Sequence, residues 1–279
     1  MPELPEVETV RRGLSPVMEG YVFDRVELRR PNLRFPFPDG FATRLEGQTI
    51  TRFGRRAKFL DVELSSGERL LMHLGMSGRF TIDGESQGKF VSDTGGIAKH
   101  DHVIFHMSSG HRVIYNDPRR FGFMELVKQG ETPERLKTLG PEPLSNSCNA
   151  PDLREKLRGK KSKIKAALLD QRIIAGLGNI YVCEALFRAR ISPKRAAGRL
   201  TVAETESLTR HIKDVISEAI EAGGSSLRDF AQADGDLGYF QPSFDVYGRE
   251  GEPCPACKAP LKRITQSGRS SFYCSACQT

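Results

Sequence analysis

Apolar side chains near the start of the chain recur at Val7, Val10, Leu14 and Val17. This spacing places them on one face of a helix, and Pro5 suits a first helical turn because its missing N–H costs no hydrogen bond there. The pattern therefore predicts an N-terminal helix that buries one face and holds the first residues of the chain in place.

A β-rich region follows this helix. Short apolar runs lie at residues 21–28, 58–64, 70–74, 103–107, 112–116 and 122–127, with turn signals such as Ser65-Ser66-Gly67 between them. Short strands at this spacing predict an antiparallel sandwich or barrel, of which we take the sandwich. Residues 83–99 are rich in glycine and polar side chains, and we predict that they form a mobile loop.

The second half of the chain has helical periodicity. Several prolines and a Gly140-Pro141 pair predict an interdomain linker at residues 133–147. Helices are expected at residues 153–158, 164–170, 180–188 and 201–221, and the chain then reverts to strand and turn. We therefore expect an α+β multidomain protein with an N-terminal antiparallel β-sandwich domain (1–132), a helical domain (148–240) and a C-terminal β-hairpin module (241–279).

Composition indicates a globular protein. The chain has 279 residues, of which 38% are hydrophobic and 28% charged, enough for two domains and a small appendage. No stretch approaches ~18 consecutive apolar residues, and the acidic start does not resemble a signal peptide. We expect a cytoplasmic protein without membrane contact, whose six cysteines are thiols or metal ligands.

The charge balance favours a polyanionic partner. The formal net charge is +7 and the pI is about 9.1. Basic residues cluster at 52–58, 118–121 and 158–165. Each run alone could be a solvated face, but three runs together with a basic C-terminal hairpin favour nucleic acid.

Four cysteines form two closely spaced pairs near the end of the chain. Cys254 and Cys257 are separated by sixteen residues from Cys274 and Cys277. This spacing predicts one structural zinc ion with four thiolate ligands and no open coordination position. Two reduced or redox-active pairs are the alternative, which a cytoplasmic location disfavours.

The first residues, Met1-Pro2-Glu3, predict a reactive terminus. Initiator methionine is usually removed before proline, which leaves the secondary amine of Pro2. An α-amine titrates at about 7.7–8.0 and a lysine at about 10.4, so near neutral pH far more of the terminal amine is nucleophilic. Attack on an aldehyde-like carbon would give an iminium, with Glu3 and Glu6 near enough to move protons. A frayed terminus is the alternative, which the predicted buried helix argues against.

The start of the chain, MPELPEVETVRRGL, closely resembles the N-terminus of bacterial formamidopyrimidine-DNA glycosylases. The resemblance covers essentially the whole chain, including the four-cysteine hairpin. It implies a bifunctional DNA glycosylase and AP lyase of base excision repair, which removes oxidised purines (8-oxoguanine and formamidopyrimidines) from duplex DNA. Pro2 would form a Schiff base with C1′ of the damaged nucleotide, followed by β,δ-elimination. The protein would be a monomer associated with the nucleoid.

The resemblance also assigns roles to individual residues. It implies that residues 176–181 belong to a helix-two-turn-helix and that residues 225–240, which include Arg228 where some relatives have lysine, close over the extruded base. The site residues it implies are catalytic Pro2, Glu3, Lys58 and Arg269, supporting Glu6 and Lys165, DNA-binding His100, Arg119 and Asn179, and void-filling Met76, Arg119 and Phe121. Arg119 could also read the base left without a partner.

Each of these residues also has an ordinary structural interpretation. Lys58 could be a surface lysine, Met76 and Phe121 could be core residues, and the glycine turn before Asn179 could be only a helix cap. His73, His100 and His102 could suggest a metal, but the sequence places no compact ligand set around them.

Two other functions remain as alternatives. One is the sister family that removes oxidised pyrimidines, which Leu4 and the void-filling set argue against. The other is a non-catalytic zinc-ribbon DNA-binding protein, which would have no use for a free terminal imino group.

Overall fold

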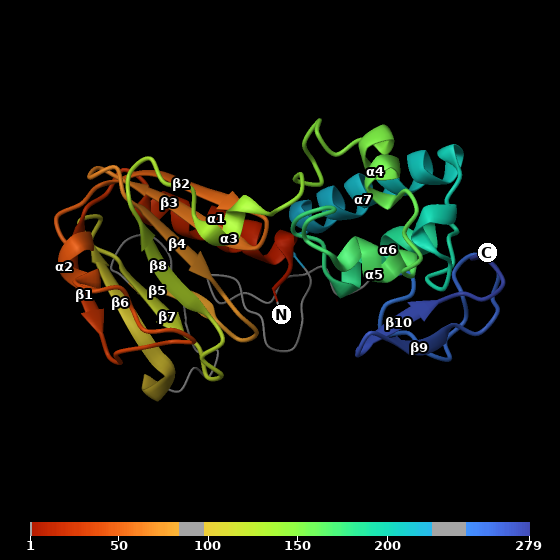
Figure 1. Ribbon diagram of the computed structural model, residues 1–279. Coiled ribbons are helices and arrows are strands. Elements are labelled where there is room, and N and C mark those ends of the chain that lie inside the picture. Colours follow the sequence, from red (N-terminus) through yellow and green to blue (C-terminus); the bar gives the residue numbers. More distant parts are fainter. Residues whose placement is uncertain (1, 84–97, 225–243) are drawn as a thin grey trace. The chain divides into compact units, whose positions relative to one another are not determined.

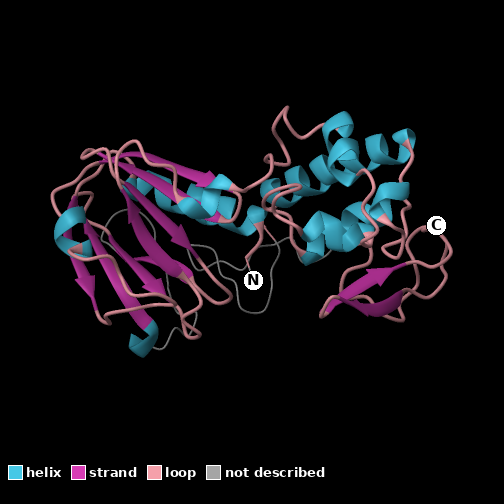
Figure 2. Ribbon diagram, in the orientation of Figure 1, coloured by secondary structure: helices cyan, strands magenta, loops and turns pink. Residues whose placement is uncertain are grey.

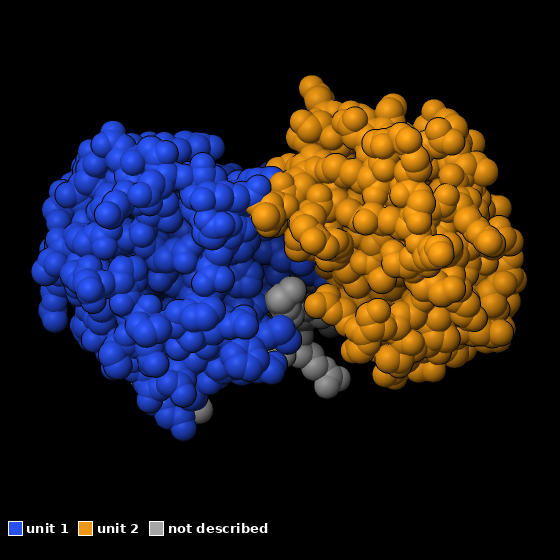
Figure 3. Space-filling view, viewed as in Figure 1, with its two compact units in different colours: residues 1–137, 222–240 blue, residues 138–221, 241–279 orange. Residues whose placement is uncertain are grey.

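The computed structural model describes residues 2–83, 98–224 and 244–279. Most of the predicted mobile loop at 83–99, and the whole of the predicted base-closing segment at 225–240, lie outside the described residues. The chain divides into two compact units, residues 1–137 with 222–240 and residues 138–221 with 241–279 (Figure 3).

Unit 1 is built on two four-stranded antiparallel sheets (Figure 1). One sheet has the order β1 (Phe23–Leu28), β6 (Asp101–Met107), β7 (Arg112–Asn116) and β5 (Arg79–Asp83). The other has the order β2 (Ile50–Arg56), β3 (Phe59–Leu64), β4 (Arg69–His73) and β8 (Phe123–Val127). Side chains from both sheets share one hydrophobic core, which confirms the predicted antiparallel β-sandwich. Strands β2 and β5 were absent from the prediction, and β2 is rich in arginine.

The N-terminal helix α1 (Leu4–Met18) packs against β2 and β3 of this sandwich. Val7, Val10 and Leu14 are buried and belong to the same core, and Val17 is partly buried against it. The predicted apolar face is therefore confirmed. A short helix α2 (Phe41–Leu45) follows β1, and α3 (Glu134–Lys137) lies within the predicted linker.

Unit 2 contains the four predicted helices as α4 (Ala150–Leu157), α5 (Ile164–Leu169), α6 (Asn179–Arg188) and α7 (Val202–Glu221) (Figure 2). Helices α4 and α6 both pack against α7, whose apolar face is buried. Two single-turn 3₁₀ helices, η1 (Ala98–His100) and η2 (Ala197–Arg199), lie in unit 1 and unit 2 respectively. The C-terminal hairpin of β9 (Lys262–Gln266) and β10 (Arg269–Tyr273) has a tight turn at Ser267-Gly268, where both residues have positive φ.

The helices of the described ranges include none that is both long and apolar enough to cross a lipid bilayer.

Candidate functional site

The predicted nucleophile Pro2 lies two residues before Leu4, the first residue of α1, and is buried. Glu3 and Glu6 are buried beside it in the chain, and the Glu3 backbone N–H donates a hydrogen bond of 2.8 Å to Oε2 of Glu6. This bond satisfies one of the backbone donors that the start of a helix leaves open. The bond therefore fixes the Glu6 carboxylate against the backbone of Glu3, the residue that follows Pro2.

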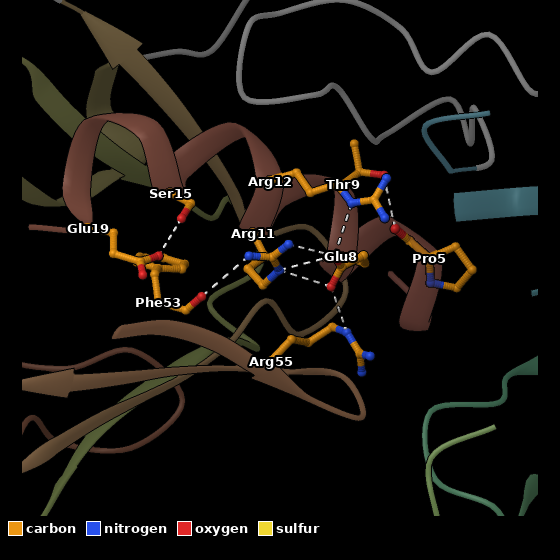
Figure 4. A network of polar contacts seen from close by, with 9 residues as sticks. All are labelled: Pro5, Glu8, Thr9, Arg11, Arg12, Ser15, Glu19, Phe53 and Arg55. Carbon is orange, nitrogen blue, oxygen red and sulfur yellow. Dashed lines mark hydrogen bonds and ion pairs between the residues drawn. The ribbon is translucent and has the colours of Figure 1, made fainter. Parts of the chain in front are cut away.

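A network around Glu8 fixes the start of α1 to strand β2 (Figure 4). The Glu8 carboxylate accepts hydrogen bonds from Nη2 of Arg11 at 2.8 Å, Nε of Arg12 at 3.0 Å and Nε of Arg55 at 3.1 Å. Burial acts to raise the pKa of Glu8, but the charges and hydrogen bonds of these arginines outweigh it, so this pKa lies below its ordinary value. Nη1 of Arg55 also donates to the Ala57 carbonyl at 2.9 Å, which connects α1 to the turn that carries Lys58.

Lys58 lies in the two-residue turn between β2 and β3, and not on a strand as its position had predicted. The turn closes because Ala57 adopts a φ of 53°, and strand pairing starts only with Phe59. Lys58 is 7% exposed, which excludes an ordinary surface lysine. Burying an ammonium group costs free energy unless polar partners surround it, so a lysine at this position reduces stability unless such partners are present.

His73, on the strand that pairs with β3, is held neutral. Burial lowers its pKa to about 4, with further lowering from the charges of Lys58, Arg135 and Arg34. Its Nδ1 accepts a hydrogen bond of 3.0 Å from the Gly75 N–H. Within the described residues, the only histidine, cysteine and carboxylate group that could hold a metal is the four-cysteine cluster.

The predicted void-filling residues lie on two loops of unit 1 and are exposed. Met76 is 38% exposed and Phe121 is 43% exposed, so neither is a core residue. The Arg119 guanidinium lies over the Phe121 ring, 4.8 Å from its centroid. We call these two segments, residues 75–78 and 118–122, the wedge loops.

Buried Asp117 holds the two wedge loops together, a role that the sequence analysis did not assign. Its carboxylate accepts hydrogen bonds from Ser77 Oγ at 2.6 Å, the Gly122 N–H at 2.9 Å and the Tyr115 hydroxyl at 3.3 Å. Ser77 in turn accepts a bond of 3.2 Å from the Arg119 N–H. The carboxylate therefore connects both loops, and its position within the Asp-Pro-Arg-Arg-Phe-Gly run was the available signal.

The predicted DNA contact His100 is hydrogen-bonded to the backbone of Asp117. Its carbonyl accepts the Asp117 N–H at 3.0 Å, and its imidazole is half-buried. His102 is buried, and its Nε2 lies 2.9 Å from the Asp117 carbonyl. His100 thus presents the more accessible ring of the pair, and His102 supports the backbone of the wedge loop.

In unit 2, two predicted site residues converge on the C-terminal hairpin. The Lys165 ammonium donates to the Ser270 carbonyl at 2.6 Å and to Ser271 Oγ at 2.7 Å, and the Asn179 amide donates to the same carbonyl at 3.0 Å. Lys165 is buried at the start of α5. Arg269, the residue before Ser270, is exposed beside the hairpin turn. Helices α5 and α6 therefore fix the backbone that carries Arg269.

The four paired cysteines gather in one cluster. Their Sγ atoms all lie within 4.8 Å of one another, with 3.9 Å between Cys254 and Cys277 and 3.5 Å between Cys257 and Cys274. Four thiolates around a zinc ion at a Zn–S distance of about 2.3 Å would lie about 3.8 Å apart, whereas a disulfide needs about 2.05 Å. The cluster therefore fits one tetrahedral zinc ion, as the spacing predicted.

Three domain families match the chain. The formamidopyrimidine-DNA glycosylase N-terminal domain matches residues 1–124, the H2TH domain of these glycosylases matches residues 139–231, and the zinc finger found in FPG and IleRS matches residues 251–279. The last match agrees with the sulfur geometry and confirms one structural zinc ion.

Full-length relatives and solved structures are also similar. Formamidopyrimidine-DNA glycosylases of Ruegeria pomeroyi and Roseobacter denitrificans are 60% and 57% identical, each over 100% of both chains. MutM (Fpg) from Thermus thermophilus has a TM-score of 0.86 and 41% identity, over 99% of this chain and 98% of that one. Lactococcus lactis Fpg in complex with abasic-site DNA has a TM-score of 0.87 and 35% identity over 100% of both chains. The chain belongs to the formamidopyrimidine-DNA glycosylase family.

Proposed function

We propose that this protein is a bifunctional DNA glycosylase and AP lyase that excises oxidised purines, 8-oxoguanine and formamidopyrimidines, from duplex DNA. The observation that carries the proposal is the start of α1: buried Pro2 and the buried N-cap residue Glu3 precede a helix that contains buried Glu6 and is anchored through Glu8. A binding module has no need to bury and fix its terminus in this way. Removal of Met1 is required, since an acylated proline nitrogen is not a nucleophile.

In this mechanism the Pro2 nitrogen attacks C1′ of the damaged nucleotide, and the glycosidic C1′–N bond breaks. Its electron pair leaves with the base, which takes up a proton. Loss of the proton from the Pro2 nitrogen and cleavage of C1′–O4′ then give the iminium, with Glu3 delivering the proton to O4′. Glu6 supports Glu3 through the bond to its backbone N–H.

The iminium makes the C2′ protons acidic because it accepts the electrons that remain after proton loss. β-Elimination then breaks C3′–O3′, and loss of a C4′ proton followed by δ-elimination breaks C5′–O5′. Water hydrolyses the iminium and frees Pro2 with release of an unsaturated aldehyde. No metal enters these steps, and the zinc ion serves to hold the hairpin that carries Arg269.

The other predicted site residues position the DNA. Lys58 in unit 1 and Arg269 in unit 2 complete the catalytic set by contacting the DNA at the lesion and its phosphate. His100 and Asn179 bind DNA, and Lys165 supports the site. Met76, Arg119 and Phe121 fill the gap left by the extruded nucleotide, which an enzyme acting on a base inside a duplex must create. Exposed apolar and cationic side chains on loops that Asp117 holds together suit this task.

The distribution of charge supports a DNA partner. Unit 2 has 20 lysines and arginines against 13 acidic residues, a net charge of +7, whereas unit 1 has 22 of each and is neutral. The whole excess therefore lies in the unit that contains the helix-two-turn-helix and the zinc hairpin. We assign the chain to three modules, 1–132, 148–240 and 241–279 with a linker at 133–147, in a monomer that acts on cytoplasmic, nucleoid-associated DNA.

Borohydride trapping tests the proposal. Protein without Met1 is incubated with a duplex that contains 8-oxoguanine, and reduction of the iminium is expected to give a covalent adduct that mass spectrometry places on Pro2. The Glu3→Gln variant is the matched control: it should still be trapped on a preformed abasic site, whose open-chain aldehyde needs no proton at O4′, but should give little adduct with the intact 8-oxoguanine duplex. Absence of any adduct would remove the enzymatic function and leave the zinc-ribbon DNA-binding alternative. Faster excision of an oxidised pyrimidine than of 8-oxoguanine would favour the sister family.

A further inference from the structure

A pocket of about 430 Å³ opens beside the second wedge loop of unit 1. It lies between that loop and the segment after β1. The residues that line it are Asn32, Leu33, Arg34, Arg119, Arg120 and Phe121. None of the first three has a role in the mechanism above, and the segment that carries them was not assigned a function from the sequence.

Backbone bonds fix the segment after β1 against the wedge loop. The Arg34 N–H donates to the Gly122 carbonyl at 3.0 Å, and the Leu33 N–H donates to the Phe35 carbonyl at 3.0 Å. Leu33 is buried in the core, so the side chains on either side of it, Asn32 and Arg34, are held at the pocket by a fixed backbone. The pocket is therefore a built feature of unit 1.

The chemistry of the lining points to a nucleotide. Among the residues that the structure describes, no carboxylate forms an ion pair with Arg34, Arg119 or Arg120. The Arg34 guanidinium lies 5.5 Å from the centroid of the Phe35 ring and that of Arg119 lies over Phe121, contacts that leave guanidinium N–H groups able to bind an anion. The exposed Phe121 ring offers a flat stacking surface, and the half-buried Asn32 amide can donate and accept hydrogen bonds. Phosphate, a flat heterocycle and a polar base edge occur together in a nucleotide.

We propose that this pocket receives the nucleotide that faces the lesion from the undamaged strand, with Arg34 binding its phosphate and Asn32 contacting its base edge. The inference rests on the proposed function. Arg119 and Phe121 occupy the space that the damaged nucleotide leaves, so the group beyond them is the base that has lost its partner. Arg34 and Asn32 approach from the side of the same pocket and are therefore specificity-determining residues for the opposite base.

The first test joins a protein change to a DNA change. Binding is measured to a duplex that contains a tetrahydrofuran abasic analogue, which the enzyme cannot cleave by its lyase chemistry. Arg34→Ala is expected to weaken binding about tenfold, the size of one charged hydrogen bond. A neutral methylphosphonate at the partner-strand position opposite the lesion should weaken binding of the wild type similarly and have no further effect on Arg34→Ala. Arg25→Ala, an exposed arginine on β1, is the control and should leave binding unchanged.

The outcomes are distinct from those of the trapping experiment. If the two losses multiply, or if only a methylphosphonate in the damaged strand removes the effect of Arg34→Ala, the partner-strand site is wrong even though wild-type trapping succeeds. Asn32→Ala is expected to reduce the rate ratio for 8-oxoguanine excised opposite cytosine over other bases. An unchanged ratio would overturn the base-edge contact. Thermal unfolding monitored by circular dichroism confirms that each variant is folded.

Discussion

Glu184 of α6 should make the stability of unit 2 depend on pH. Its side chain is 2% exposed, and its carboxylate accepts the N–H groups of Asp245, Val246 and Tyr247 at 2.7, 3.0 and 2.8 Å. Burial raises the pKa of Glu184 from 4.5 to about 7, although these three hydrogen bonds act to lower it. This carboxyl therefore joins α6 to the chain entering the zinc module and titrates close to neutrality.

The sign of the effect follows from the raised pKa. Between pH 4.5 and pH 7 the folded protein holds a proton on Glu184 that the unfolded chain has lost. The contribution of this group to the free energy of unfolding is therefore present below pH 4.5 and falls as pH rises to 7. The difference between the pKa of about 7 in the folded protein and 4.5 in the unfolded chain corresponds to a loss of about 3 kcal/mol in the free energy of unfolding over this pH interval. Glu184→Gln, which cannot ionise, should not lose this stability.

The assay is urea unfolding of the zinc-loaded full chain at pH 5 to 8, combined with amide hydrogen exchange at Asp245, Val246 and Tyr247. The free energy of unfolding of the wild type minus that of Glu184→Gln isolates the titration of Glu184, because the other titrating groups are common to both proteins. This difference should fall with rising pH. Glu204→Gln is the matched control: Arg195 holds the pKa of Glu204 at about 2, so that group stays ionised throughout. A difference that is flat or that rises with pH would show that the three N–H donors outweigh burial and would refute the reasoning.

Three further predictions concern the wedge loops and the metal. Asp117→Asn replaces an acceptor of the Gly122 N–H with an amide, and excision of 8-oxoguanine should fall at least tenfold while trapping on single-stranded abasic DNA is retained; equal losses in both assays would contradict a positioning role. Gly122→Ala would place a Cβ 1.8 Å from the Tyr115 hydroxyl. This clash should lower the free energy of unfolding by on the order of 1–3 kcal/mol and the midpoint of thermal unfolding by several degrees. Removing zinc with a chelator, or Cys257→Ser, should abolish DNA binding and lower hairpin amide protection with the sandwich amides unaffected.

The features that the sequence predicted are those with a local signal. The apolar spacing of α1, the four helices of unit 2 and the cysteine pairs each depend on residues close together in the chain. Strand β2 was not predicted because its arginines hide the alternation of a half-buried strand, and the Lys58 turn depends on an alanine in an unusual backbone conformation.

The burial of two carboxylates, those of Asp117 and Glu184, was also not predicted from the sequence. Charged residues are mostly exposed, so the residue types of Asp117 and Glu184 do not indicate burial, and the Asp-Pro-Arg-Arg-Phe-Gly run was the one local signal for Asp117. Their partners are remote in the chain: Ser77 lies 40 residues from Asp117, and Asp245 lies 61 residues from Glu184. Only the tertiary structure brings these donors to the carboxylates. It is likewise the tertiary structure that brings Arg34 to the same pocket as Arg119 and Phe121.

The separation of charge between the two units has a consequence for how the protein searches a genome. The net attraction to any stretch of undamaged duplex acts on unit 2, while the basic runs of unit 1 are offset by an equal number of acidic residues in that unit. Raised ionic strength should therefore shorten the time spent scanning, and leave the excision step almost untouched once a lesion is engaged. One half of the molecule therefore carries the net attraction to DNA, while both halves supply residues to the proposed site.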